Sequence, residues 1–166
     1  MRFEIRQPDQ PAVIEPADRD QVLQVIQNLA ENALKYAPQG TAVILELGVD
    51  VTAEAAAEPQ RAGTAHLSLL TPDHAAGKRY VLLRVCDQGA GVAREHLPRL
   101  TERFYRVEGQ RGPERAGTGL GLAIVKHIVN RHRGGLVVES ALGEGTIFSV
   151  YFPMAPAQPE PDFPAA

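Results

Sequence analysis

Residues 28–38 read NLAENALKYAP, and this stretch places an unusual polar face on a helix. The helix is predicted to start at Asp18, which can cap it with Gln21 completing a capping-box pattern, and to end near Tyr36. At 100° per residue, the apolar residues of this helix fall on one face, which should pack on a sheet: Val22, Val25, Ile26, Leu29 and Ala33.

The opposite face of the helix carries amides where a solvated face would be rich in Glu and Lys. Its members are Gln21, Gln24, Asn28, Glu31, Asn32 and Lys35. Asn is a poor helix former because its side chain competes for backbone hydrogen bonds, so two of them in a helix interior need a reason. The spacing leaves two interpretations open. One is a solvated polar face, and the other is a Mg²⁺ and phosphate site built from amide oxygens and the Lys35 charge.

The rest of the chain alternates between strand and helix patterns. Strands are predicted at 2–6, 41–49, 80–86, 136–140 and 146–152, with a short helix at 93–100 and a longer one at 118–133. We therefore predict an α/β fold for residues 1–153, a two-layer sandwich with a mixed, mostly antiparallel sheet covered on one face by about three helices. Residues 50–79 are interpreted as an insertion at the surface with a short strand at 66–70, and the proline-rich residues 154–166 as a disordered tail.

Composition limits the class of protein. Seventeen Lys and Arg oppose 20 Asp and Glu among 166 residues, a net charge of -3 that argues against nucleic-acid binding. The single cysteine, Cys86, excludes an internal disulfide and fits a reducing cytoplasm, where it is expected to be a small core residue. No apolar run approaches the ~20 residues of a membrane helix. We expect a cytoplasmic, monomeric domain without membrane contact of its own, which is compatible with a parent protein anchored in the inner membrane.

The first of two glycine clusters, residues 87–91, reads DQGAG and follows a predicted strand directly. Asp87 can accept a hydrogen bond from an exocyclic amine, and Gly89 and Gly91 allow close approach to the backbone. An ordinary turn explains the same residues, because Asp and Gly favour turns.

The second cluster, residues 117–121, reads GTGLG and opens a helix that Thr118 can cap. Bare N–H groups and the helix dipole favour anions there. Leu122 stands where a dinucleotide fingerprint needs Gly or Ala, and the chain has no Gly-Lys-Ser/Thr triplet of a Walker loop. Between the clusters, RFYR at 103–106 is followed by Arg111 and Arg115. This segment is either a basic patch or a mobile lid over 101–117, anchored by Phe104, whose arginines reach a triphosphate.

In order and spacing, these motifs resemble the catalytic domain of bacterial sensor histidine kinases. Residues 28–38 resemble the N box, 87–91 the first glycine box, 103–106 the F box, 117–125 the second glycine box, and 143–146 the closing Gly-x-Gly-Thr element. The resemblance covers roughly residues 12–153, and its wording is nearest to kinases of the phosphate-sensor type. It implies a Bergerat fold that binds ATP and Mg²⁺.

The resemblance also implies roles for individual residues. Asp87 would bind the adenine amine, with Thr146 assisting through water, and Asn32 and Asn28 would hold Mg²⁺. The phosphates would be contacted by Lys35, Tyr36 and Arg106, and by Arg115 from the lid. The glycine boxes would contribute Gly89, Gly91, Gly117, Thr118, Gly119, Leu120 and Gly121.

The acceptor of the phosphoryl group would be a histidine on a separate dimerisation domain, for relay to a response regulator. No histidine in the chain is followed by Glu or Asp and then Pro, and His127 and His132 are expected on the surface of the second helix. Hydrolysing relatives carry a Glu one turn before the metal-binding Asn, but that place holds Asn28, which cannot act as a base. Glu31 lies nearby and can polarise a nucleophile. Two alternatives therefore stay open, an ATP hydrolase or switch of the same superfamily and a non-catalytic docking module.

Overall fold

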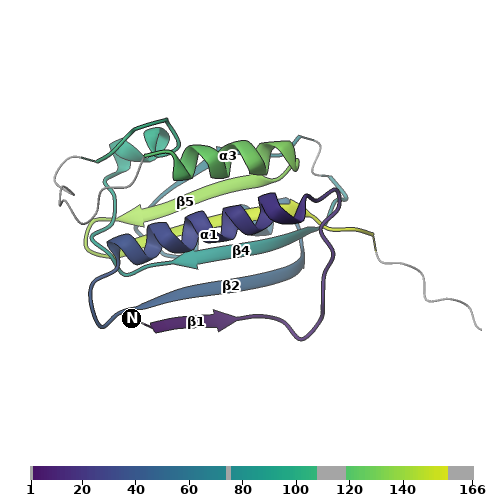
Figure 1. Cartoon of the computed structure of the whole chain (residues 1–166), viewed down its shortest axis with the longest axis horizontal. Helices are drawn as coiled ribbons and strands as arrows, with labels where there is room; N and C mark the ends of the chain where they lie inside the picture. Colours follow the sequence, from purple (N-terminus) through teal and green to yellow (C-terminus); the bar gives the residue numbers. More distant parts are fainter. Residues whose placement is uncertain (1, 74–75, 108–118, 157–166) are drawn as a thin grey trace, which may run out of the picture.

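One mixed sheet of six strands organises the molecule (Figure 1). The computed structural model describes residues 2–73, 76–107 and 119–156. The strand order is β1-β2-β4-β6-β5-β3, in which β1 pairs parallel to β2 and every other neighbour is antiparallel. The predicted mixed, mostly antiparallel sheet is thus confirmed. The strands are β1 (Arg2–Arg6), β2 (Ala42–Val51), β3 (Ala65–Leu70), β4 (Tyr80–Cys86), β5 (Gly135–Ala141) and β6 (Gly145–Pro153).

Two long helices, α1 (Arg19–Tyr36) and α3 (Gly121–Arg131), and the 3₁₀ helix η1 (Arg94–Arg99) cover one face of the sheet. The cap of α1 is as predicted, because the Asp18 side chain accepts from the N–H groups of Asp20 and Gln21 at 3.0 and 3.1 Å. The predicted apolar face is also confirmed. The residues of this apolar face are buried in the core or packed against it: Val22, Val25, Ile26, Leu29 and Ala33. The opposite, polar face of α1 does not pack on the sheet.

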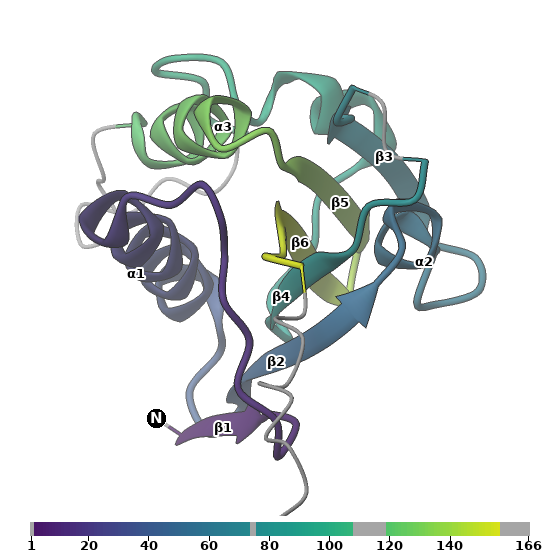
Figure 2. The ribbon, with the colours of Figure 1, turned by 90° about the vertical axis from the view of Figure 1, so that its right-hand side faces the viewer.

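Residues 50–79 contribute two elements to the fold. The predicted short strand is confirmed as β3, which pairs with β5 at the edge of the sheet. The helix α2 (Ala53–Ala57) was not predicted, and it packs on the face of the sheet opposite α1 and α3 (Figure 2). There Ala53 and Ala56 contact a second apolar cluster that includes Tyr80 and Tyr151. Both faces of the sheet therefore carry helix.

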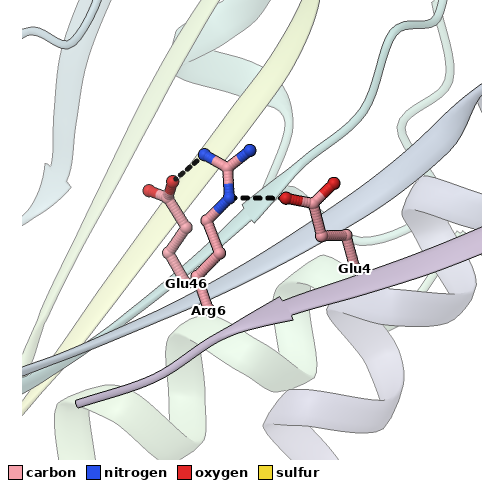
Figure 3. Close-up of polar contacts among 3 residues, drawn as sticks. All are labelled: Glu4, Arg6 and Glu46. Atoms are coloured by element: carbon pink, nitrogen blue, oxygen red, sulfur yellow. Dashed lines mark hydrogen bonds and ion pairs between the residues drawn. The ribbon is translucent and has the colours of Figure 1, made fainter.

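Charged side chains link the edge strand β1 to its neighbour β2. Arg6 donates to Glu4 at 2.7 Å and to Glu46 at 3.1 Å, and Glu46 is its partner in the parallel register (Figure 3). These groups are solvent-exposed, so they specify register more than they stabilise the fold.

Two details of the sequence-based account are corrected by the fold. His127 is exposed as expected, but His132 is buried at the end of α3, so its placement on the helix surface was wrong. Antiparallel pairing also continues past the expected boundary at Pro153, since Ile14 bridges Met154 and the N–H of Ala155 donates to Val13 O. Residues 157–166 of the predicted tail lie outside the described residues. In the described ranges, no helix has the length and apolarity needed to cross a membrane.

Candidate functional site

A cavity of about 430 Å³ opens between α1, the carboxyl end of β4 and the start of α3. Its volume lies in the range of small-molecule sites. Most of the described residues that the sequence singled out line it together: Asn28, Glu31, Asn32, Lys35, Tyr36, Asp87, Gly91, Arg106, Gly119, Gly121 and Thr146. Gly89 and Leu120 are not among the lining residues.

The wall formed by α1 presents amides and one cation. The amide nitrogen of Asn28 faces the carbonyl oxygen of Gly121 at 3.4 Å, which leaves its amide oxygen as the atom that can bind a cation. Glu31 accepts from Gln27 Nε2 at 2.9 Å and lies on the exposed side of the wall. The polar face of α1 therefore lines a cavity and is not simply a solvated surface.

Two cationic side chains, Lys35 and Arg106, line the cavity. Burial, followed by the nearby charge of Arg106, lowers the pKa of Lys35. The Lys35 ammonium also lies 5.5 Å from the centre of the Tyr36 ring. Two like charges are held close only at a cost, which an anionic ligand between them would relieve.

Another part of the cavity wall is formed by the buried Asp87. Its Oδ1 accepts from the N–H of Gly89 at 2.8 Å, and its own N–H donates to the carbonyl oxygen of Thr146 at 3.0 Å. Burial raises the pKa of Asp87 in spite of the N–H groups of Gly89 and Thr146 and the charge of Arg61, which act in the opposite direction. A buried carboxylate that needs further donors is suited to bind an amine.

Apolar side chains also line the cavity, among them Val92, Ile124 and Phe148. Ile124 and Phe148 belong to helix and strand patterns that predict core packing, and these patterns do not indicate that the side chains also face a ligand. An apolar wall beside a buried carboxylate fits a heterocyclic base.

Glycine is required at two points of this architecture for different reasons. Gly91 has a φ of +72°, and a Cβ there would lie 1.9 Å from the carbonyl oxygen of Ala141, so only glycine closes the loop against the β5–β6 turn. At Gly121 a Cβ would meet none of the described residues within 4 Å outside its own turn of helix. The space at the start of α3 is thus left open toward the cavity.

The segment before the second glycine cluster is anchored by a different residue from the one predicted. The Phe104 side chain is 70% exposed, so its predicted anchoring role is wrong, and only its N–H is held, by Gly119 O at 2.9 Å. Tyr105 is the anchor, because its hydroxyl lies 2.5 Å from His96 Nδ1 and its ring packs under Arg99 at 4.3 Å. The only feature of the sequence that points to Tyr105 is its position next to Arg106.

Several predicted residues cannot be placed. Residues 108–118, which include most of the proposed lid, lie outside the described residues, and so do Arg111, Arg115, Gly117 and Thr118, for which roles were predicted.

The donor set fits magnesium held jointly with a phosphate. In the described ranges there is no group of three or more His, Cys, Asp or Glu side chains able to hold a metal. Among the oxygens that line the cavity are the amides of Asn28 and Asn32, with Glu31 beside them. Mg²⁺ commonly takes one or two protein oxygens and completes its shell with phosphate and water.

Comparison with known proteins identifies the class. The family model described as "Histidine kinase-, DNA gyrase B-, and HSP90-like ATPase" matches residues 17–156, and the chain belongs to this family. The resemblance to the catalytic domain of sensor histidine kinases is thereby confirmed.

Individual relatives agree with this assignment. The chain is 38% identical over 148 residues to the phosphate regulon sensor protein PhoR of Pseudomonas aeruginosa, covering 89% of the chain and 27% of PhoR. It is 34% identical over 137 residues to the sensor histidine kinase RppB of Synechocystis, covering 82% of the chain and 24% of RppB. The chain thus spans about a quarter of the length of these relatives.

Solved structures show the same fold. The mycobacterial sensor histidine kinase MprB aligns with a TM-score of 0.64 at 26% identity, covering 93% of this chain and 83% of that one. Full-length ShkA in complex with AMPPNP aligns with a TM-score of 0.64 at 25% identity, covering 95% of this chain and 27% of that one.

Proposed function

We propose that this domain binds Mg-ATP and transfers the γ-phosphate to a histidine on a separate dimerisation domain of the same parent kinase, for relay to a response regulator. One observation carries the proposal. A buried carboxylate (Asp87), an α1 wall that carries two amides and the Lys35 ammonium, and apolar side chains such as Phe148 line one cavity. These three kinds of group suit the amine, the phosphates and the ring of ATP.

In the proposed complex the adenine amine donates to Asp87, and Thr146 assists through water. The triphosphate extends along α1 toward the open start of α3, where Gly119 and Gly121 leave room and N–H groups favour anions. Lys35, Tyr36 and Arg106 contact the phosphates, with Arg115 from a lid at 101–117. Asn32 and Asn28 hold Mg²⁺, which when bound neutralises phosphate charge.

Phosphoryl transfer depends on positioning and charge neutralisation more than on a base supplied by this chain. A neutral histidine already carries a lone pair on one ring nitrogen, so the acceptor attacks without strong base catalysis. Asn28 occupies the position from which a base would activate water, and an amide cannot do so. Glu31 lines the cavity within the reach of a solvent-side nucleophile, and this residue supports the second candidate, ATP hydrolysis.

ATP affinity measured with and without Mg²⁺ tests the binding step. We expect tight binding only with Mg²⁺, whereas no binding in either condition would favour a docking module. Transfer is tested by adding a dimeric acceptor domain from the same parent kinase. Acid-labile phosphohistidine on that domain supports the kinase. Steady phosphate release without phosphohistidine supports the hydrolase.

A further inference from the structure

A buried carboxylate holds a loop of the 50–79 segment against the sheet. Glu139 of β5 is only 3% exposed, and it accepts from the N–H groups of Gln60 at 2.8 Å and Arg61 at 2.6 Å. The Thr64 hydroxyl donates to the same carboxylate at 2.7 Å. Since a buried charge must be satisfied, these three donors fix the position of residues 60–64.

From this fixed loop Arg61 reaches the β5–β6 turn. Its Nη1 donates to the carbonyl oxygen of Glu144 at 2.5 Å. The next residue, Gly145, packs so closely on the adenine end of the cavity that a Cβ there would lie 2.1 Å from the carbonyl oxygen of Asp87. Thr146 follows and accepts from the Asp87 N–H. Arg61 therefore binds the residue directly before Gly145 and Thr146, whose backbone contacts Asp87.

The same turn is held from inside the fold by Ser140, the neighbour of Glu139. Its fully buried hydroxyl lies 2.8 Å from Thr146 Oγ1, donates to Gly145 O at 2.9 Å and accepts from Val92 N at 2.8 Å. Ser140 thus joins the turn to the loop after the first glycine cluster, and Arg61 holds the outer side of the turn.

We propose that residues 58–64 form a buttress for the base pocket, in which Arg61 is a positioning residue that holds Asp87 and Thr146 in place for the adenine ring. The proposal rests on the proposed function, since it assigns the cavity to ATP. The charge of Arg61 also reaches Asp87, where it favours the ionised form that accepts the amine. A role for this segment in nucleotide affinity follows, although the segment does not line the cavity.

The test compares Arg61→Ala with the wild type in binding Mg-ATP and Mg-tripolyphosphate, which lacks the base. We expect ATP affinity to fall about 3–10-fold, because one charge-assisted hydrogen bond at a partly exposed site is lost. Tripolyphosphate affinity should stay unchanged, since the phosphate end does not touch the turn. Arg61→Lys, which keeps the charge and one donor, should restore part of the ATP affinity.

Two controls separate this effect from general loosening. Arg79→Ala removes another arginine of the 50–79 segment, one that contacts Asp50 O at 3.4 Å away from the pocket. Glu144→Ala removes a side chain but keeps the carbonyl that Arg61 binds. Both variants should bind ATP like the wild type.

Equal ATP affinity of Arg61→Ala and the wild type overturns the buttress and leaves the proposed function intact. Equal loss of ATP and tripolyphosphate binding, with a lowered melting temperature, also overturns it in favour of a purely structural role. Should Arg61→Ala not fold, Arg61→Gln read by the same ratio of the two affinities decides the question. A wild type that binds no ATP removes the proposed function and this inference together.

Discussion

The Nε2 atom of His132 accepts a hydrogen bond from the backbone N–H of Asp18 at 3.0 Å, and this contact joins the end of α3 to the start of α1. The other ring nitrogen donates to the carbonyl oxygen of Ile128 at 2.8 Å, so the two partners define a neutral ring with its proton on Nδ1. The ring also meets Phe152 edge-on at 5.7 Å. His132 therefore fixes how the two helices that bound the cavity sit on the sheet.

Replacing His132 by Leu should lower the free energy of unfolding by about 1–3 kcal/mol, because the Asp18 N–H loses its acceptor in a partly buried setting. Thermal or urea unfolding measures this. His127→Leu, an exposed change in the same helix, is the control and should stay within about 0.5 kcal/mol of the wild type. Equal stabilities of the two variants would show that the contact between the helices contributes nothing.

Asp87→Asn should weaken ATP binding by about 1.5–3 kcal/mol, because the amide cannot replace the charged acceptor of the adenine amine. Calorimetric titration with Mg-ATP measures the loss, and circular dichroism checks the fold. Unchanged affinity in a folded variant would remove Asp87 from the base pocket.

The ionisation of Asp87 also gives a pH dependence with a definite sign. Burial raises the pKa of this carboxyl, and the adenine amine needs the ionised form. ATP affinity should therefore decline as the pH falls, starting at a higher pH than an exposed aspartate would show, and Asp87→Asn should lack this decline. Without nucleotide the sign is opposite, since a raised pKa in the folded state contributes stability at low pH that is lost as the pH rises through it. An acid decline of the same size in Asp87→Asn would assign the titration to another group.

Most of the predicted site residues that the structure describes line one cavity, because they belong to strong local patterns in the sequence, and their roles toward ATP stay predictions. The spacing of residues along the chain predicts the amide face of α1 and the carboxylate after β4, and the fold brings both to one cavity. The sequence does not indicate that Tyr105, and not Phe104, is the anchor. Both residues are aromatic, and only the contacts of Tyr105 with His96 and Arg99 distinguish them.

Two further features that the sequence did not predict depend on contacts between segments distant in sequence. His132 was assigned to the helix surface because its partner, Asp18, lies 114 residues away. The loop around Glu139 was missed for the same reason, because a glutamate in a strand pattern looks like a solvent-facing residue until residues 60–64 fold over it. Helix α2 is too short for a periodic pattern to reveal.

Asn32→Ala should leave the fold intact and abolish the Mg²⁺ dependence of ATP binding. The side chain lies on the half-buried cavity face of α1, and alanine is the better helix former. Melting temperature without ligand, and affinity with and without Mg²⁺, are the two measurements. A large fall in melting temperature with Mg²⁺ dependence retained would make Asn32 structural instead.

Glycines 121 and 91 should respond to substitution in opposite ways. Gly121→Val should fold but bind ATP at least tenfold more weakly, because its side chain would enter space that the described residues leave open beside the cavity. Gly91→Ala should destabilise the protein, because its Cβ would overlap the Ala141 carbonyl oxygen. Unfolding curves and ATP titrations of both variants separate the two effects. Normal ATP affinity in Gly121→Val would place the phosphates elsewhere.

Arg106→Ala tests the phosphate end of the cavity separately from its base end. The Arg106 side chain lines the cavity, and its charge lowers the pKa of Lys35. Removing it should reduce phosphoryl transfer to the acceptor domain about 10–100-fold, a loss of roughly 1.4–2.7 kcal/mol of phosphate stabilisation.

The affinity of the same variant for adenosine, which lacks phosphates, should not change, because the base pocket stays whole. Arg103→Ala removes a neighbouring exposed arginine that does not line the cavity, and it should transfer phosphate at the wild-type rate. Phosphohistidine formation on the added acceptor domain measures transfer for all three proteins. Transfer by Arg106→Ala at the rate of Arg103→Ala would exclude Arg106 from the phosphate clamp and leave Lys35 as the only described cation that lines the cavity.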